Sequence, residues 1–281
     1  MKRWLTTTLA VLVCSAALRA DVTIVQTTTM EGGMASMAAA SGAGNISPRL
    51  TTRVKGMKGR TDIETGPVTV NTIVDLVNKQ VIILRADQKT ATMVSPVPPP
   101  AAGTPGAAPN VTMPANIDAA VAPTGKSQVI DGFKCDEFTF TTRMSMGEVT
   151  GRQMPPEAAS MMQGVTMVMA GSMWVAKEAP GAAEYVAFQK AAASGELAAA
   201  ALGASGMSVP GMEKLTKAMS SINGLAYLTE MTINIEGTGQ VADMMKQMGP
   251  MKITTRVNSI KSEPLSDDLF KVPEGYTVIK R

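Results

Sequence analysis

Residues 49–94 carry the feature that most constrains this chain, a regular alternation of apolar and polar side chains between turn-forming residues. Leu50, Thr52 and Val54 lie on one side of an extended strand, with charged and polar residues on the other. Segment 75–79 then turns the chain into a further apolar run at 81–84. The stretch predicts a meander of short antiparallel strands with one buried face. The same spacing of two recurs at Val68, Val70, Thr72, Val74 and Leu76.

The first twenty residues are typical of a secretory signal peptide. A basic start precedes an apolar run from Trp4 to Leu18, which is too short to span a bilayer comfortably, and small residues follow it. We expect cleavage after Ala20, with Ala17 as the next choice. The mature protein is therefore predicted to be periplasmic or secreted, and not integral to a membrane.

Lipidation at Cys14 is the weaker alternative, because a lipoprotein signal requires a small residue before the modified cysteine and Val13 precedes it. Loss of residues 1–20 removes three of the 26 basic residues and no acidic one, leaving 23 of each sign and a net charge of zero. A neutral chain has no electrostatic attraction to nucleic acid or to an anionic membrane surface. Cys135 is then the single cysteine and cannot form an internal disulfide.

Residues 95–125 differ abruptly in composition from the rest of the chain. They contain eight of its 17 prolines, one charged residue, Asp118, and no aromatic residue. Such a stretch buries too little apolar surface to offset the entropy of ordering it. We expect a disordered Pro-rich insertion inside a single domain that covers residues 21–281.

The strand pattern resumes after the insertion. Asp131 and Gly132 form a hairpin-type dipeptide, and the segments 225–236 and 251–257 alternate cleanly. A helix is expected from Glu184 to Leu202, which is rich in Ala. A second helix, from Pro210 to Ile222, carries an apolar stripe, and near the C-terminus Ser266, Asp267 and Asp268 form an N-cap sequence.

The segment 133–140 holds apolar residues of both parities. Phe133 and Cys135 share one parity, and Phe138 and Phe140 share the other. A bulge near Asp136 is needed if all four residues face one core.

Four segments together resemble an uncharacterised family of exported bacterial proteins known only as a domain of unknown function, which is itself similar to the LolA/LolB lipoprotein carriers. The resemblance covers most of residues 21–281, apart from an Ala/Gly loop and the Pro-rich insertion. It implies an α+β fold, in which a curved antiparallel half-barrel is covered on its concave side by helices. An apolar cavity would lie between them, where the carriers hold acyl chains, and no catalytic residue carries over. The segments are TTRVKGMKGRTDIE, TIVDLVNKQVIILRADQKTATM, IDGFKCDEF and DDLFKVPEGYTVI.

The composition argues against an enzyme. The chain has no histidine, which excludes Ser-His-Asp and Cys-His catalysis, and no lysine has a serine three residues before it. Cys135, beside Asp136, is expected to be a buried small hydrophobe. Carboxylate pairs such as Asp62 and Glu64 are of the kind that any sheet surface supplies. We expect no enzyme and no cofactor.

The 23 methionines stand out against an aromatic content of 4%. We interpret them as adaptable core and cavity lining, because unbranched flexible side chains accept ligands of variable shape. Thioethers also bind copper(I), so methionine-based copper binding is one alternative. A second alternative is a structural or interaction protein of the cell envelope, with a filled core and a Pro-rich loop that engages a partner protein.

The favoured hypothesis is a periplasmic, non-enzymatic binding or carrier protein that holds a hydrophobic ligand, a lipid or an acyl chain, between sheet and helices. Its predicted cavity lining is Val68, Val70, Val81, Ile83, Met167, Met169, Trp174, Tyr227, Met231, Ile233, Met251 and Ile253.

Overall fold

A computed structural model gives the fold of most of the chain. The predicted signal peptide, residues 1–20, and residues 95–110 of the Pro-rich stretch lie outside the described residues. The structure describes residues 21–33, 36, 47–66, 68–94, 111–112, 117–145, 150–151, 164–193, 207–208 and 222–280.

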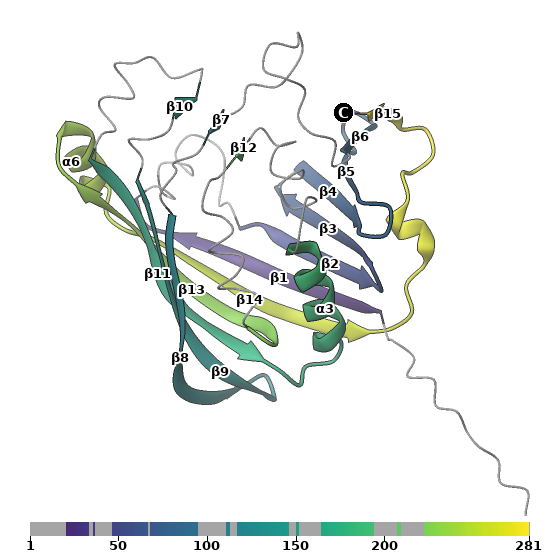
Figure 1. The fold of residues 1–281 in the computed structure, drawn as a ribbon, viewed down its shortest axis with the longest axis horizontal. Coiled ribbons are helices and arrows are strands. Elements are labelled where there is room, and N and C mark those ends of the chain that lie inside the picture. The colour runs from purple at the N-terminus through teal and green to yellow at the C-terminus, as the bar shows by residue number, and fades with distance from the viewer. Residues whose placement is uncertain are drawn as a thin grey trace, which may run out of the picture.

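One twelve-stranded sheet dominates the described part of the chain (Figure 1). Its strands are β1 (Val22–Glu31), β2 (Arg49–Lys55), β3 (Lys58–Thr65), β4 (Val68–Asp75), β5 (Gln80–Arg85), β6 (Thr90–Val94), β8 (Ile117–Ile130), β9 (Phe133–Ser145), β11 (Val165–Ala176), β13 (Leu225–Gly237), β14 (Met251–Ser262) and β15 (Thr277–Lys280). Their order in the sheet is β15-β6-β5-β4-β3-β2-β1-β14-β13-β11-β9-β8. A small second sheet joins β7 (Val111–Thr112), β10 (Thr150–Gly151) and β12 (Met207–Ser208).

The predicted meander is confirmed as the five strands β2 to β6, which pair antiparallel in sequence order. Its turns are stabilised by side chains that lie within the turns themselves. The Asp75 carboxylate accepts the backbone N–H groups of Val77 and Asn78, each at 3.0 Å, and Lys79 adopts a left-handed φ of 50°. This turn leads directly from β4 into β5.

An early strand and a late strand of the chain pair in the middle of the sheet. The first strand, β1, pairs antiparallel with β2 on one side and with β14 on the other. Asp21 reinforces the join, because its side chain accepts the N–H of Leu265 at 2.8 Å and its backbone carbonyl accepts that of Glu263 at 3.1 Å. The meander and the later strands therefore form one continuous layer.

The predicted fold class, an antiparallel half-barrel covered by helices, is wrong. The sheet is open, with β15 and β8 as separate edges, and it is mixed because β15 runs parallel to β6. In the described part of the chain the α-helices of at least one full turn are α3 (Ala182–Ala193) and α6 (Gln240–Gln247). A helix of the length of α3 spans about 18 Å, whereas eleven inter-strand spacings span about 53 Å. Such a helix covers only a small part of the sheet.

The structure describes much of one predicted helix and almost none of the other. The helix expected from Glu184 to Leu202 appears as α3, which begins two residues earlier, and residues 194–202 lie outside the described part. Most of the helix expected from Pro210 to Ile222 also lies outside it. Ile222 itself is buried against Met173 and Val175.

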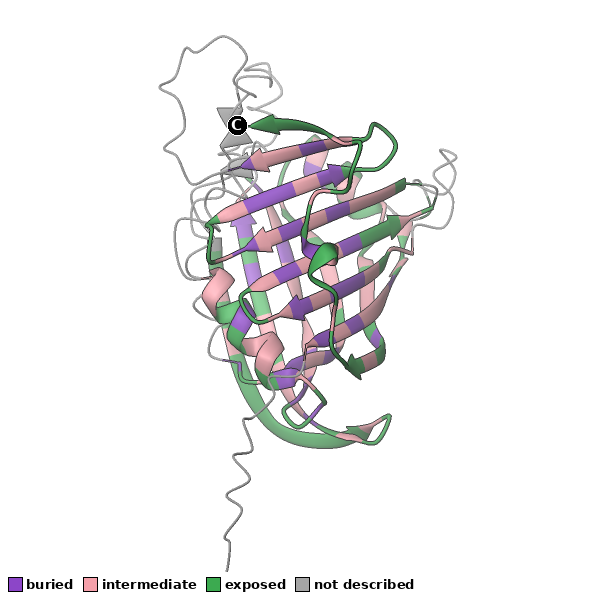
Figure 2. Ribbon diagram, turned by 90° about the vertical axis from the view of Figure 1, so that its right-hand side faces the viewer, coloured by how far each residue is buried: buried purple, intermediate pink, exposed green. Residues whose placement is uncertain are grey.

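Apolar clusters pack against several parts of the sheet. The largest joins Val22, Ile24 and Val54 of the first strands to Phe188 of α3 and Leu225 of β13. A second cluster lies between β4 to β6 and the C-terminal segment, whose 3-10 helix η2 (Asp267–Phe270) contacts β3 (Figure 2). The predicted N-cap is present there, since Ser266 Oγ accepts the N–H of Asp268 at 3.3 Å.

Two expectations for the strands after the insertion need correction. Residues 117–125 of the stretch expected to be disordered form the first part of β8, and the exposed edge tolerates Pro123 because one side of an edge strand needs no N–H donor. The bulge expected near Asp136 is absent from the β9–β11 register, and an irregularity lies instead in β8 between Pro123 and Ser127. Cys135 joins the largest cluster while Phe138 and Phe140 join a different one. Both parities of β9 are therefore apolar because each meets its own cluster.

Candidate functional site

Six of the predicted cavity residues stand together on one face of β11, β13 and β14. We call this set the methionine face, and each of its six side chains is half-buried. Met169 lies opposite Ile233, which lies opposite Met251, and Met231 lies opposite Ile253. Since directly opposed residues point to the same side of a sheet, the six side chains form one apolar surface. Its members are Met167, Met169, Met231, Ile233, Met251 and Ile253.

Neighbouring strands extend the methionine face. Met144 on β9 lies opposite Met167, and Met30 on β1 lies opposite Ile253. Ile235 lies opposite Met167 on its other side. Sequence reasoning did not include these three residues in the cavity, although Ile235 follows Ile233 at the same spacing of two.

The predicted residues of the meander lie apart from this surface. Strands β3, β2 and β1 separate β4 from β14 in the sheet. Val81 is buried in a small cluster with Val94, and Val70 and Ile83 are half-buried. Val68, at the start of β4, is 56% exposed. The predicted residues of β4 and β5 therefore form a group separate from the methionine face.

Tyr227 and Trp174 belong to a third environment. Tyr227 is buried beside Phe133, with ring centroids 5.6 Å apart, and its hydroxyl donates to Asp131 Oδ2 at 3.1 Å. Burial and the hydrogen bond to Asp131 raise the pKa of Tyr227 to about 12. Trp174 lies opposite Leu228 and packs against the same cluster as Tyr227. It follows Met173 on β11, so the two side chains point to opposite sides of the sheet. We interpret both residues as core.

A charged cluster that sequence reasoning missed surrounds Asp62 on β3. The Asp62 carboxylate accepts from Asn71 at 2.6 Å, from Arg60 at 2.7 Å and from Arg53. Burial raises the pKa of Asp62, but the hydrogen bonds from these three side chains outweigh it and hold the pKa below its usual range. Arg60 also donates to the backbone carbonyl of Leu269 at 3.0 Å, which ties the C-terminal segment to the sheet.

The cluster has a structural role. Arg53 and Arg60 lie directly opposite each other on β2 and β3, where two like charges are destabilising without an acid between them. A hairpin that turns at Gly56 pairs Arg53 with Arg60, so the two opposed like charges could have been identified from the sequence. An ionised Asp62 that is fully occupied with donors is not suited to proton transfer at neutral pH.

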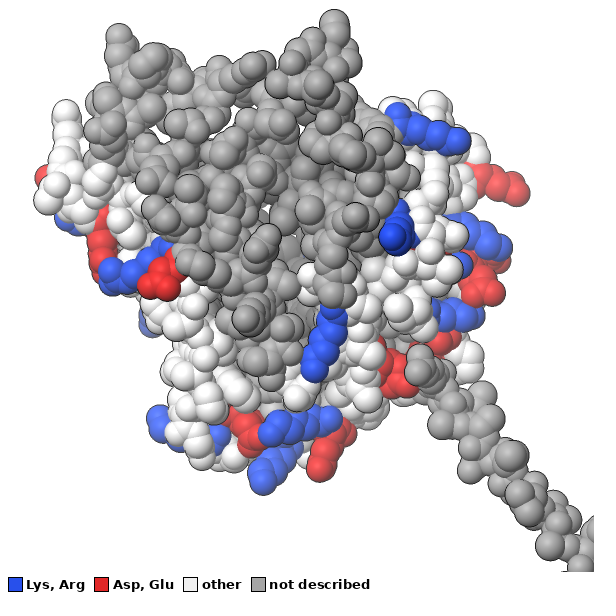
Figure 3. Space-filling view, viewed as in Figure 1, with Lys and Arg blue, Asp and Glu red and all other residues white. Residues whose placement is uncertain are grey.

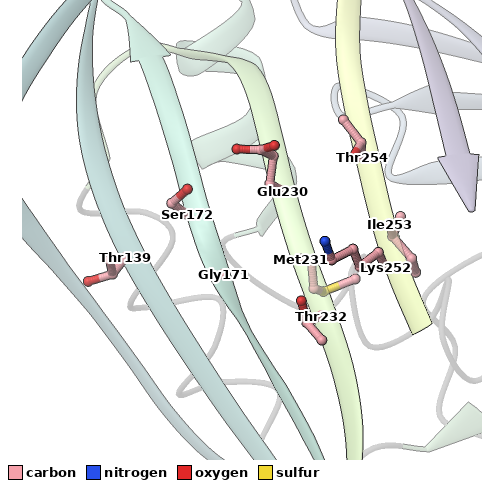
Figure 4. Close-up of a pocket in the computed structure, with 9 residues that line it drawn as sticks. All are labelled: Thr139, Gly171, Ser172, Glu230, Met231, Thr232, Lys252, Ile253 and Thr254. Atoms are coloured by element: carbon pink, nitrogen blue, oxygen red, sulfur yellow. The ribbon is translucent and has the colours of Figure 1, made fainter. Parts of the chain in front are cut away.

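The opposite face of the same strands is polar and bears a pocket of about 380 Å³ (Figure 4). One row across four strands is built of Thr139, Ser172, Glu230 and Thr254, which lie opposite one another in turn. The adjacent row contains Thr232 opposite Lys252. The pocket offers hydroxyl groups, one carboxylate and one ammonium group to a ligand, and Met231 and Ile253 add apolar lining.

Cys135 is fully buried on β9, and its Sγ lies 3.5 Å from the carbonyl oxygen of Phe133. Burial raises the pKa of the Cys135 thiol, which keeps it protonated. This confirms the expectation of a buried small hydrophobe. No group of three or more acidic, Cys or His side chains suited to a metal occurs within the described ranges. No helix in those ranges is long and apolar enough to cross a bilayer.

Charges of both signs are mixed on the surface. In the view of Figure 3, basic and acidic side chains of the described residues neighbour each other around the periphery. Several are paired, including Lys177 with Asp136 at 2.7 Å and Arg256 with Asp131 at 2.9 Å.

Comparisons with known proteins give little guidance. No family model and no curated protein matches the chain. Among solved structures, it is similar to an uncharacterized conserved protein from Thermus thermophilus, with a TM-score of 0.40 and 6% identity over 94% of this chain and 92% of that one. It is also similar to PNGF-II, with a TM-score of 0.34 and 11% identity over 93% of this chain and 31% of that one. Similarity at this level carries no functional argument.

Proposed function

We propose that the protein is an exported, non-enzymatic binding or carrier protein for a hydrophobic ligand, a lipid or an acyl chain. The observation that carries the proposal is the methionine face, six apolar side chains on three adjacent strands that are each only half-buried. The ligand lies on this face of the sheet.

The burial of other apolar residues in the same sheet supports the proposal. Val22 and Ile24 on β1 are 0% and 1% exposed, which is the burial expected of a sealed core. The methionine face keeps accessible apolar surface at Met169, Ile233 and Met251. Apolar surface in contact with water costs about 25 cal/mol per Å², so covering it with an acyl chain is favourable.

The choice of side chains supports a ligand of variable shape. Four of the six residues of the methionine face are methionines, whose unbranched side chains change conformation at low cost. The predicted signal peptide supports an exported location, where a carrier would meet lipids. The surface of mixed charge gives no reason to propose nucleic acid as a partner.

A titration of the purified full chain with palmitic acid tests the proposal. The substitutions Ile233→Asn and Met169→Asn each place a polar amide on the methionine face and are expected to weaken binding by about tenfold or more. Met57→Asn is the matched control, because Met57 is 42% exposed at the turn between β2 and β3 and lies off this face.

Equal affinity of all three variants and the unchanged chain for palmitic acid would contradict the proposal, as would an absence of binding. Circular dichroism of each variant separates loss of binding from loss of folding. An absence of binding with an intact fold would favour the alternative, an envelope interaction protein with a filled core.

A further inference from the structure

The pocket on the polar face holds two opposite charges that lack partners. The side chains of Glu230 on β13 and Lys252 on β14 form no hydrogen bond or ion pair with any residue in the described part of the chain. Both side chains are exposed. On the same face Arg143 and Glu236 are paired at 3.2 Å, whereas Glu31, which lies directly opposite Lys252 on β1, forms no ion pair with it among the described residues.

The register explains why the two charges remain apart. Glu230 lies opposite Thr254, and Thr232 lies opposite Lys252, so Glu230 and Lys252 are diagonal neighbours. The Cα atoms of such a pair are about 7–8 Å apart. Figure 4 shows the Lys252 side chain extending from β14 toward β13, with Glu230 further along β13.

We propose that this pocket binds a small zwitterion, an α-amino acid in its free form. Its ammonium group is held by Glu230 and its carboxylate by Lys252. A ligand with a single charge is attracted by one of these residues and repelled by the other, which disfavours simple anions and cations. A zwitterion satisfies both at ordinary hydrogen-bond lengths of about 2.7–2.9 Å.

The rest of the pocket suits a ligand of this size. The hydroxyl groups of Ser172, Thr232 and Thr254 can donate or accept, and so complete the hydrogen bonds of either charged group. Gly171 also lines the pocket, and a Cβ there would lie 2.0 Å from the carbonyl oxygen of Glu230, so the close approach of β11 to β13 at this point requires glycine. The volume of about 380 Å³ lies at the small end of the range for small-molecule sites.

Met231 and Ile253 of the methionine face also line this pocket, but the two charged residues project from the other side of the sheet. Glu230 and Met231 are consecutive residues of β13, so their side chains point to opposite sides of the sheet. The lipid-binding test changes Met169 and Ile233, which do not line this pocket, so failure of one proposal can be distinguished from failure of the other.

Titration calorimetry and saturation-transfer NMR of the full chain with L-alanine test the proposal. Glu230→Gln and Lys252→Gln are each expected to weaken binding by about tenfold or more, since each removes a charge-assisted hydrogen bond. Glu236→Gln and Lys261→Gln make the same charge changes on the same two strands outside the pocket, and they are expected to leave the affinity unchanged. The double variant E230K/K252E exchanges the charges and is expected to bind better than either single variant.

Acetate, methylammonium and methyl glucoside serve as ligand controls with one charge of either sign or none. The proposal predicts that none of them displaces L-alanine. Displacement by one of these molecules at a concentration similar to that of L-alanine would overturn it. So would equal affinity of Glu230→Gln and Glu236→Gln, or no binding of L-alanine by the folded chain.

Discussion

The ring of Phe188 on α3 lies directly over Gly59 on β3, in the space that a side chain at residue 59 would need. A Cβ atom built on Gly59 would lie 2.2 Å from Cζ of Phe188. The ring is buried in the largest apolar cluster, beside Val54 and Leu225. This contact fixes where α3 meets the sheet.

Substitution Gly59→Ala is therefore expected to destabilise the protein by about 1–3 kcal/mol, because the added methyl group displaces a buried aromatic ring. Phe188→Ala alone is expected to cost about 3–5 kcal/mol. In the double variant the methyl group added at position 59 enters the space left by the ring, so the combined cost is expected to be less than the sum of the two. Urea denaturation of the four proteins measures this coupling. Strict additivity would show that the residues do not compete for the same space.

Asp62 gives a prediction about pH. Its folded-state pKa is lowered, so the stability from its ionised form is present above the ordinary carboxyl pKa of about 3.9 and is lost as the pH falls through the lower folded value. Substitution Asp62→Ala leaves Arg53, Arg60 and Asn71 without their acceptor. We expect a loss of about 3 kcal/mol at pH 7.

The gap in unfolding free energy between the original chain and Asp62→Ala is expected to shrink below about pH 4, where the original carboxyl also becomes protonated. Glu64→Ala is the matched control, because Glu64 is exposed two residues further along the same strand. It is expected to change stability by less than about 0.5 kcal/mol. A gap that stays constant from neutral pH down to about pH 3 would argue against an ionised Asp62 as the source of the stability.

Cys135 is expected to resist thiol reagents while the protein is folded. Its side chain is 0% exposed and its pKa is raised, so neither access nor thiolate is available. Labelling with a chromogenic disulfide reagent, in a Cys14→Ser background, is expected to be slow without denaturant and complete in urea. Rapid labelling of the native chain would mean that β9 opens readily.

Features of the fold that depend on neighbouring residues were predictable from the sequence. Features that depend on contacts between residues far apart in the sequence were not. The meander follows from alternation and turn chemistry within a few residues, as at Asp75 and Lys79. The hairpin at Asp131 and Gly132 follows in the same way, with φ values of 49° and 86°. The pairing of β1 with β14 depends on residues at opposite ends of the chain, and no local pattern specifies it.

The candidate site shows the same limit. Alternation within β11, β13 and β14 correctly grouped Met169, Ile233 and Met251 by parity. It could not reveal that β3, β2 and β1 separate the strand of Val68 from them, because strand order is a property of the whole sheet. Alternation also could not reveal that the two faces of β9 pack against different apolar clusters, with Cys135 in one cluster and Phe138 in another.

The most direct test of the proposed function is the content of the protein as it leaves the cell. The full chain is expressed in a host that exports it, purified without detergent and extracted with organic solvent, and the extract is analysed by mass spectrometry. We predict a lipid or fatty acid in near-stoichiometric amount, reduced in the double variant M169N/I233N and unchanged in Met57→Asn. A folded protein that yields no lipid, or equal lipid in all three forms, would contradict the account.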